Sequence, residues 1–284
     1  MTTITHQDGE MTRLCREAQD IEELAWWDIY SAAPEAYARQ HELRATRLPG
    51  GTCFAHRHLL TWDFNRVLKL GTSSPTTEPL LNEVQAWMVR NASPAYAIGV
   101  DPNTQPELVS KWLQATGLNK DDGGMTRFFH DGPERAVDIK STLNVREIQP
   151  HEGDLFGALV RTAFDLAEGF DTWFGQLAGR PGWRIFIACN GAEPVATGAM
   201  YLNEGRAWLG LGATLKDHRR RGAQSLLLNL RVSEAKKMGI NSIHIETENP
   251  APGAQRDSSY RNILKAGFKV LFVRDHYMAA SPTD

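Results

Sequence analysis

Hydrophobic and polar residues follow regular patterns in the second half of the chain, from about residue 143 to residue 279. Alternation predicts half-buried strands, and apolar residues that recur every three or four positions predict amphipathic helices. The expected strands are Leu143–Ile148, Arg184–Cys189, Val195–Leu202, Arg206–Leu215, Ser242–Thr247 and Phe268–Met278. The expected helices are Gly153–Phe164, Thr172–Ala178, Ala223–Met238 and Ser258–Ala266. Turn residues at 190–191 and 203–205 predict that three of the strands form an antiparallel meander.

The first half contains part of the same order of elements in a fainter form. The matching segments are Asn65–Gly71, Leu80–Arg90, Ala95–Val100, Glu107–Gly117 and Met125–His130, in the order strand, helix, strand, helix, strand. This similarity predicts a tandem repeat of one fold rather than a solenoid. We expect a first domain at residues 1–138 and a second at residues 144–279.

Composition is ordinary for a globular protein. The 284 residues are 42% hydrophobic and 23% charged, which is enough chain for two domains of common size. The net charge of −3 gives no general basic surface for nucleic acid or an anionic membrane, so neither is an expected partner. The sequence is compatible with a monomer or a homodimer.

Three further features point to the cytoplasm. The first residues contain no apolar leader segment, and no apolar run approaches the ~20 residues of a membrane span. The three cysteines, Cys15, Cys53 and Cys189, are far apart in the sequence. They have neither zinc-ligand spacing nor a disulfide pattern, so we expect no metal.

The segment Thr214–Gln224 is the part of the sequence that points to chemistry. It is a basic loop between a predicted strand and a predicted helix. The first N–H groups of a helix have no partner within the helix, and the helix dipole adds positive charge there. Gly222 allows the backbone to approach a ligand closely, and the arginines add forked donors. The segment therefore predicts a phosphate site.

This segment resembles the acetyl-CoA motif of the GNAT acetyltransferase superfamily, R/Q-x-x-G-x-G/A. Arg219 and Gly222 match the motif, while Gln224 replaces its small last residue. Ser259–Phe268 is similar to the late helix of the family, which ends in a Gly-Phe pair. The order of elements also agrees, so the resemblance covers about half of the chain.

The resemblance implies an α+β fold, the GNAT acyl-CoA N-acyltransferase fold, with a mixed and mostly antiparallel sheet flanked by helices. It also implies acetyl-CoA as co-substrate and an amine as acceptor. The fourth strand would separate from the fifth and pair with the pantetheine arm, and the glycines of 209–214 suit a bulge there. The implied cofactor-binding residues are Gly212, Ala213, Thr214, Arg219, Arg220, Arg221, Gly222, Ala223, Gln224 and Asn262.

The catalytic groups are less defined. Ile263 occupies the position where many GNAT enzymes have an acidic Tyr, and Tyr260 lies one helical turn earlier. His244 and Glu246 alternate with apolar residues, so both should point from one face of the fifth strand. We expect Glu246 to be the base, with His244 as second choice and Tyr260 as a substitute acid.

Three functions were compatible with these patterns. The first is an N-acetyltransferase that acts on a small-molecule or peptide amine. The second is a catalytically silent acyl-CoA sensor, which the replaced Tyr and small residue favour. The third, a nucleic-acid binder that uses 219–221, lacks an aromatic platform. The loop at 72–79 has no arginine and no glycine, so the first repeat should not bind acetyl-CoA.

Overall fold

The structure is a computed structural model that describes residues 6–72, 76–102, 106–133 and 139–279. Its helices are α1 (His6–Ser31), α2 (Glu35–Gln40), α3 (Glu78–Asn91), α4 (Pro106–Ala115), α5 (Gly153–Ala163), α6 (Phe170–Gly175), α7 (Ala223–Lys237) and α8 (Ser258–Lys265). Its strands are β1 (Leu43–Leu48), β2 (Gly51–His56), β3 (Arg66–Leu68), β4 (Ala97–Val100), β5 (Asn119–Lys120), β6 (Met125–His130), β7 (Asn144–Glu147), β8 (Trp183–Asn190), β9 (Glu193–Asn203), β10 (Arg206–Thr214), β11 (Ser242–Glu248) and β12 (Lys269–Met278). Three 3₁₀ turns lie at Trp62–Phe64, Pro150–Glu152 and Lys216–His218.

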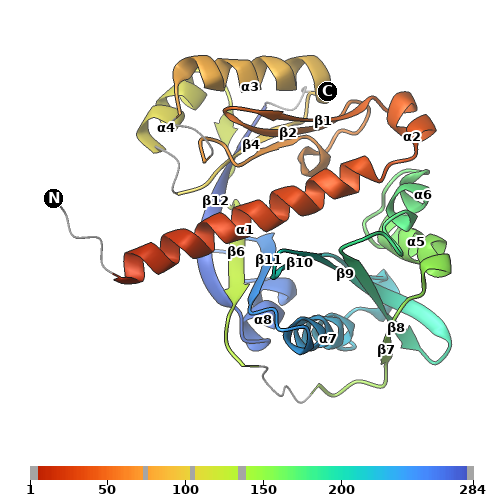
Figure 1. The fold of residues 1–284 in the computed structure, drawn as a ribbon. Coiled ribbons are helices and arrows are strands. Elements are labelled where there is room, and N and C mark those ends of the chain that lie inside the picture. The colour runs from red at the N-terminus through yellow and green to blue at the C-terminus, as the bar shows by residue number, and fades with distance from the viewer. Residues whose placement is uncertain (1–5, 73–75, 103–105, 134–138, 280–284) are drawn as a thin grey trace.

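The two halves of the chain repeat one topology. In the first half, β1, β2 and β3 pair antiparallel, and β3 pairs parallel with β4 across the crossover helix α3. In the second half, β8, β9 and β10 pair antiparallel, and β10 pairs parallel with β11 across α7. The structure therefore confirms the tandem α+β arrangement that the faint repeat predicted (Figure 1).

The two halves share one sheet, in the order β1-β2-β3-β4-β12-β6-β11-β10-β9-β8-β7. Strand β6 belongs to the first half by sequence, yet it lies between β11 and β12 of the second half. Strand β12 pairs with β6 at its start and with β4 at its end. The expected domains 1–138 and 144–279 are thus interleaved in the sheet, and no break in it lies between them.

Helix α1 crosses between the two halves and packs against both (Figure 1). Its Asp28 accepts hydrogen bonds from Arg180 at 2.7 and 2.9 Å and from the indole of Trp183 at 2.7 Å. The indole of Trp173 donates to the carbonyl of Ile29 at 2.7 Å. These contacts fix the helix to the second half, and its apolar residues join a core that includes both halves.

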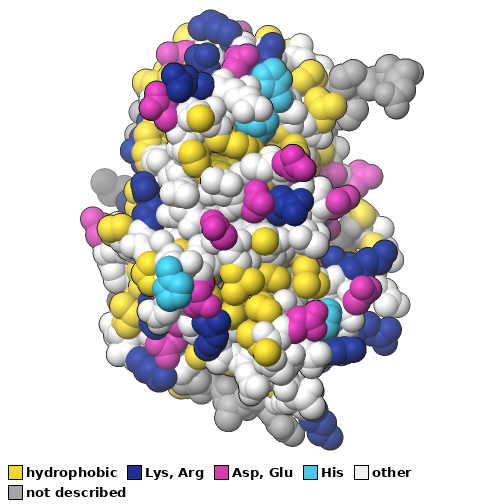
Figure 2. All heavy atoms as spheres, turned by 90° about the vertical axis from the view of Figure 1, so that its right-hand side faces the viewer, with side chains coloured by type: hydrophobic (Ala, Val, Ile, Leu, Met, Phe, Trp, Pro, Cys, Tyr) yellow, Lys and Arg dark blue, Asp and Glu magenta, His cyan; other side chains and the backbone are white. Residues whose placement is uncertain are grey.

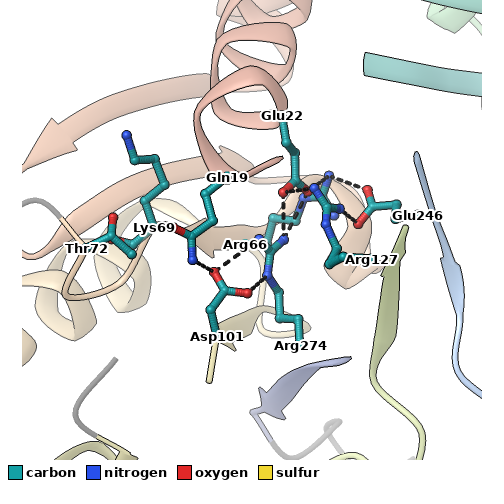
Figure 3. A network of polar contacts seen from close by, with 9 residues as sticks. All are labelled: Gln19, Glu22, Arg66, Lys69, Thr72, Asp101, Arg127, Glu246 and Arg274. Carbon is teal, nitrogen blue, oxygen red and sulfur yellow. Dashed lines mark hydrogen bonds and ion pairs between the residues drawn. The ribbon is translucent and has the colours of Figure 1, made fainter. Parts of the chain in front are cut away.

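A network of buried charges lies where α1 meets the centre of the sheet (Figure 3). Its carboxylates are Glu22, Asp101 and Glu246, and its guanidinium groups are Arg66, Arg127 and Arg274. Burial of an unpaired charge is costly, so pairing and hydrogen bonding are what make this cluster tolerable. The network connects α1 to β3, β4, β6, β11 and β12.

The described part of the second half packs on both faces of its sheet. Helices α7 and α8 cover one face, with Leu227, Val232 and Ile263 among the buried residues. Helices α1, α5 and α6 supply the core on the other face. The three cysteines are buried. Within the described residues, no helix is long and apolar enough to cross a membrane.

Candidate functional site

A cleft of about 1180 Å³ opens where β10 separates from β11. The two strands pair in parallel only over Arg206–Leu209 and Ser242–Ile245. Beyond Leu209 the β11-facing edge of β10 has no strand partner, and Gly210–Thr214 line the cleft. An extended ligand that carries amide groups can therefore add to this edge as a further strand would.

A bulge in β10 shapes this part of the cleft. The register of β10 with β9 shifts between Gly210 and Ala213, and Leu211 has a left-handed backbone with φ of 48°. A Cβ on Gly210 would lie 1.8 Å from the ring of Trp208, so only glycine fits beneath that side chain. The bulge expected from the two glycines is present, and Gly212, Ala213 and Thr214 line the cleft as predicted.

The start of α7 forms the basic end of the cleft. The residues that line it there are Arg219, Arg220, Gly222, Ala223 and Gln224, all of which were predicted to bind the cofactor. Gly222 caps the helix in the left-handed region, at φ of 84°. A Cβ there would lie 3.2 Å from both Ile139 and Ser141, so the glycine also permits close packing. Free N–H groups and two arginines at one 15-residue helix suit a pyrophosphate.

Arg221 does not line the cleft, contrary to the prediction. Its side chain is exposed, and its carbonyl accepts a hydrogen bond of 2.7 Å from Ser141. The left-handed residues on either side, Arg220 and Gly222, turn the chain sharply here. Consecutive residues then point in different directions, so the arginine run does not act as one patch.

Gln224 joins α7 to α8. Its amide nitrogen donates to Ser259 at 2.9 Å, and its amide oxygen accepts from Asn262 at 2.7 Å. Both Gln224 and Asn262 line the cleft as expected. The side chain that replaces the small residue of the motif is therefore held against α8 by two hydrogen bonds.

Glu246 lines the cleft, but its carboxylate is held by arginines. It pairs with Arg127 and lies 3.8 Å from Arg66. Burial raises the pKa of Glu246, and the nearby guanidinium groups outweigh that effect and lower it to about 2. A carboxylate with so low a pKa is a weak proton acceptor, so the structure argues against Glu246 as the base.

His244 and Tyr260, the second-choice base and the substitute acid, are not among the residues that line the cleft. His244 shares a strand face with Glu246, but α1 crosses that face and leaves His244 1% exposed. Its Nε2 lies 2.8 Å from the hydroxyl of Ser242, and burial lowers its pKa to about 3. Tyr260 is buried against Phe128, with ring centroids 4.9 Å apart, so its hydroxyl is not an acid in the cleft.

The first half of the chain supplies one wall of the cleft, and sequence reasoning missed it. Trp26 comes from α1, while Leu60, Asp63 and Phe64 come from the segment between β2 and β3. Neither region has a motif, because the wall is created by the packing of α1 against β10 rather than by local sequence. Among the described residues, no group of three or more His, Cys, Asp or Glu side chains is arranged to hold a metal ion.

Comparison with known proteins agrees with this geometry. Residues 151–256 match the model of the GNAT acetyltransferase family, and this range contains β8 to β11 together with α7. The second half of the chain therefore carries a GNAT acetyltransferase domain. No curated protein matches the sequence.

Several solved structures share the fold. A GCN5-related N-acetyltransferase from Kribbella flavida has a TM-score of 0.58 and 16% identity over 87% of this chain and 94% of its own. One from Sphaerobacter thermophilus has a TM-score of 0.58 and 13% identity over 83% and 82%. A tandem GNAT protein from the clavulanic acid biosynthesis pathway has a TM-score of 0.50 and 16% identity over 82% and 79%. These similarities show a GNAT fold in tandem.

Proposed function

We propose that this chain, whose residues 151–256 match the GNAT acetyltransferase family, transfers an acetyl group from acetyl-CoA to an amine. The observation that carries the proposal is the cleft between β10 and α7. Its strand edge suits the amide groups of a pantetheine arm, and the start of α7 with Arg219 and Arg220 suits the pyrophosphate. Gly222 and the β10 bulge bring the two parts together on one surface.

The co-substrate would supply a thioester that a neutral amine attacks, forming a C–N bond as the C–S bond breaks. A thiol has a pKa near ~8.5, so it leaves as a thiolate without needing a strong acid. Glu246 stays ionised beside Arg127, and the surrounding arginines balance its charge. The proton of the amine therefore passes to another base.

A silent acyl-CoA sensor is the second candidate, and one observation favours it. None of the described tyrosines lines the cleft, and Ile263, which occupies the expected position of the acid, is 1% exposed in the core. Such a protein would bind acetyl-CoA and release no product. Binding alone therefore does not distinguish the two candidates, and turnover does.

The test is incubation of the full chain with acetyl-CoA and a panel of primary amines. Released CoA is followed by its thiol, and the N-acetylated product is identified by mass spectrometry. We expect product and CoA in equal amounts with at least one amine. Tight binding of acetyl-CoA without product from any amine class would support the sensor and overturn the enzyme.

A further inference from the structure

The cleft is divided between two kinds of surface. At the start of α7 it is basic, with Arg219 and Arg220. On the opposite side, segment 59–64 and α1 bring apolar side chains and a carboxylate. The cleft volume of about 1180 Å³ exceeds the ~300–1,000 Å³ of common ligand pockets, so it has room for a donor and an acceptor. The binding of acetyl-CoA does not explain the apolar and acidic surface formed by segment 59–64 and α1.

Large apolar side chains stand exposed on both walls of this part of the cleft. Leu60 is 73% exposed on the wall of the first half, and Phe164 is 50% exposed at the end of α5. Trp26, Phe64 and Trp208 line the cleft with their rings packed together, with centroids 5.7 Å apart for Trp26–Phe64 and 6.4 Å apart for Trp26–Trp208. Exposed apolar side chains that line one cleft are a surface for an apolar ligand.

The side of the molecule that carries α2, α5 and α6 combines apolar and charged surface (Figure 2). Hydrophobic side chains gather there in patches, and both acidic and basic side chains lie between them. The apolar patches fit the apolar body of a ligand.

Asp63 is the carboxylate best suited to such a charge. It lines the cleft, it is partly exposed to solvent, and it accepts a hydrogen bond of 3.2 Å from Thr61. The partial loss of solvent around the carboxyl raises its pKa, Arg66 and Thr61 offset part of that change, and Glu246 adds a smaller increase. Two carboxylates of one cleft therefore have pKa values moved in opposite directions, because Glu246 is held ionised by Arg127. Asp63, the carboxylate whose pKa is raised, is the better proton acceptor of the two.

We propose that the acceptor is a primary amine with an apolar body, which lies between Leu60 and Phe164 with its ammonium group on Asp63. This inference rests on the proposed acetyl transfer and names its acceptor class. The ammonium passes one proton to the Asp63 carboxylate, and the neutral nitrogen then attacks the thioester carbon. The C–N bond forms as the C–S bond breaks, and the departing thiolate takes up the second proton of the nitrogen, so that the products are the amide and free CoA. The first half of the chain thereby contributes a catalytic residue to the domain of the second half.

The first experiment measures kcat/KM for 2-phenylethylamine and ethanolamine with acetyl-CoA. Burial of the phenyl group predicts a preference of about 30-fold or more for 2-phenylethylamine. Leu60→Ser should reduce that preference, while Val89→Ser, at a side chain 62% exposed on α3 and outside the cleft, should leave it unchanged. Equal use of both amines, or a preference for ethanolamine, would overturn the apolar acceptor and leave acetyl transfer intact.

The second experiment isolates the charge. Binding of 2-phenylethylamine and of neutral 2-phenylethanol is measured by calorimetry on the complex with CoA. The amine should bind at least about tenfold more tightly, and Asp63→Asn should abolish this difference and lower kcat/KM by about 10²-fold. Asp122→Asn, at an exposed carboxylate outside the cleft, is the matched control. An unchanged difference in Asp63→Asn would overturn the role of Asp63. Absence of product from every amine would instead refute the proposed function.

Discussion

The guanidinium of Arg274 donates from Nε to Oδ1 of Asp101 at 2.8 Å, which joins the last strand of the chain to the end of β4 in the first half. Both side chains are 1% exposed. Arg274 also pairs with Glu22 of α1 at 2.9 Å. One buried cation thus connects three elements that are far apart in the sequence, and the shared sheet depends on it.

We predict that Arg274→Met lowers the free energy of unfolding by about 3–5 kcal/mol, because it removes a buried cation that pairs with both Asp101 and Glu22. Lys269→Met is the matched control on the same strand. Lys269 is 60% exposed and pairs with Asp131 at 2.9 Å, so its loss should cost only ~0–1 kcal/mol. Urea unfolding followed by circular dichroism measures both. Equal effects would show that the buried network contributes no more than a surface pair.

Strand β6 of the first half lies between β11 and β12 of the second half, and we call this arrangement the strand exchange. It predicts that neither half folds well alone. A chain of residues 139–284 lacks β6, so β11 and β12 lose the neighbour that pairs with both. We expect this fragment and residues 1–133 to show little amide protection separately and to regain it when they are produced together. Cooperative unfolding of fragment 139–284 by itself would contradict the exchange.

Much of this fold was predictable from local sequence. The strands and helices of residues 143–279 were predicted to within a few residues, because periodicity and turn residues specify them locally. The elements α1, α2, β1, β2 and β5 and the place of β6 in the sheet were not predicted. Helix α1 has Gln19, Glu22 and Glu23 buried in its packed face, so its apolar pattern is interrupted. The place of β6 depends on pairing with β11, more than 100 residues later.

Some residues of the candidate site could be predicted from local sequence, and others could not. The donor side follows from a motif, and nine of its ten predicted residues line the cleft. The catalytic predictions depended on what covers the face of β11. His244 and Glu246 do share a face, but α1 and the arginines of the network cover it and remove both as bases. The acceptor wall at 59–64 arises only when the halves pack together.

Three buried histidines predict how stability depends on pH. Burial is the main cause of their lowered pKa values, which are about 4 for His56 and about 3 for His244 and His276. These groups are neutral in the folded state, while the unfolded state takes up protons below about pH 6.5. The contribution of these neutral histidines to the free energy of unfolding is present above pH 6.5. It is lost as the pH falls from there towards their lowered pKa values in the folded state.

As pH falls from 6.5 to 5, the slope contributed by each histidine approaches a limit of about 1.4 kcal/mol per pH unit. Carboxylates with lowered pKa values act mainly below pH ~4.5. The pKa of Asp63 is raised, so the comparison with a histidine variant is what isolates one imidazole. Urea titrations at several pH values give the slope. His244→Gln should reduce this slope by the part that one buried histidine contributes. His151→Gln, at an exposed site, should leave the slope unchanged. A slope that His244→Gln leaves unchanged would mean that this imidazole is protonated in the fold.

The central claim is that one acetyl-CoA site lies between β10 and α7, and calorimetric titration with acetyl-CoA tests it most directly. Gly222→Glu adds a negative charge and a side chain at the start of α7, the proposed pyrophosphate end of the cleft, and Gly191→Glu is the control. Gly191 also has a positive φ, of 61°, but stands at the β8–β9 hairpin with no atom within 4 Å of an added Cβ. We predict one site per chain, unchanged in Gly191→Glu and lost in Gly222→Glu. Two sites per chain, or full affinity in Gly222→Glu, would contradict the claim.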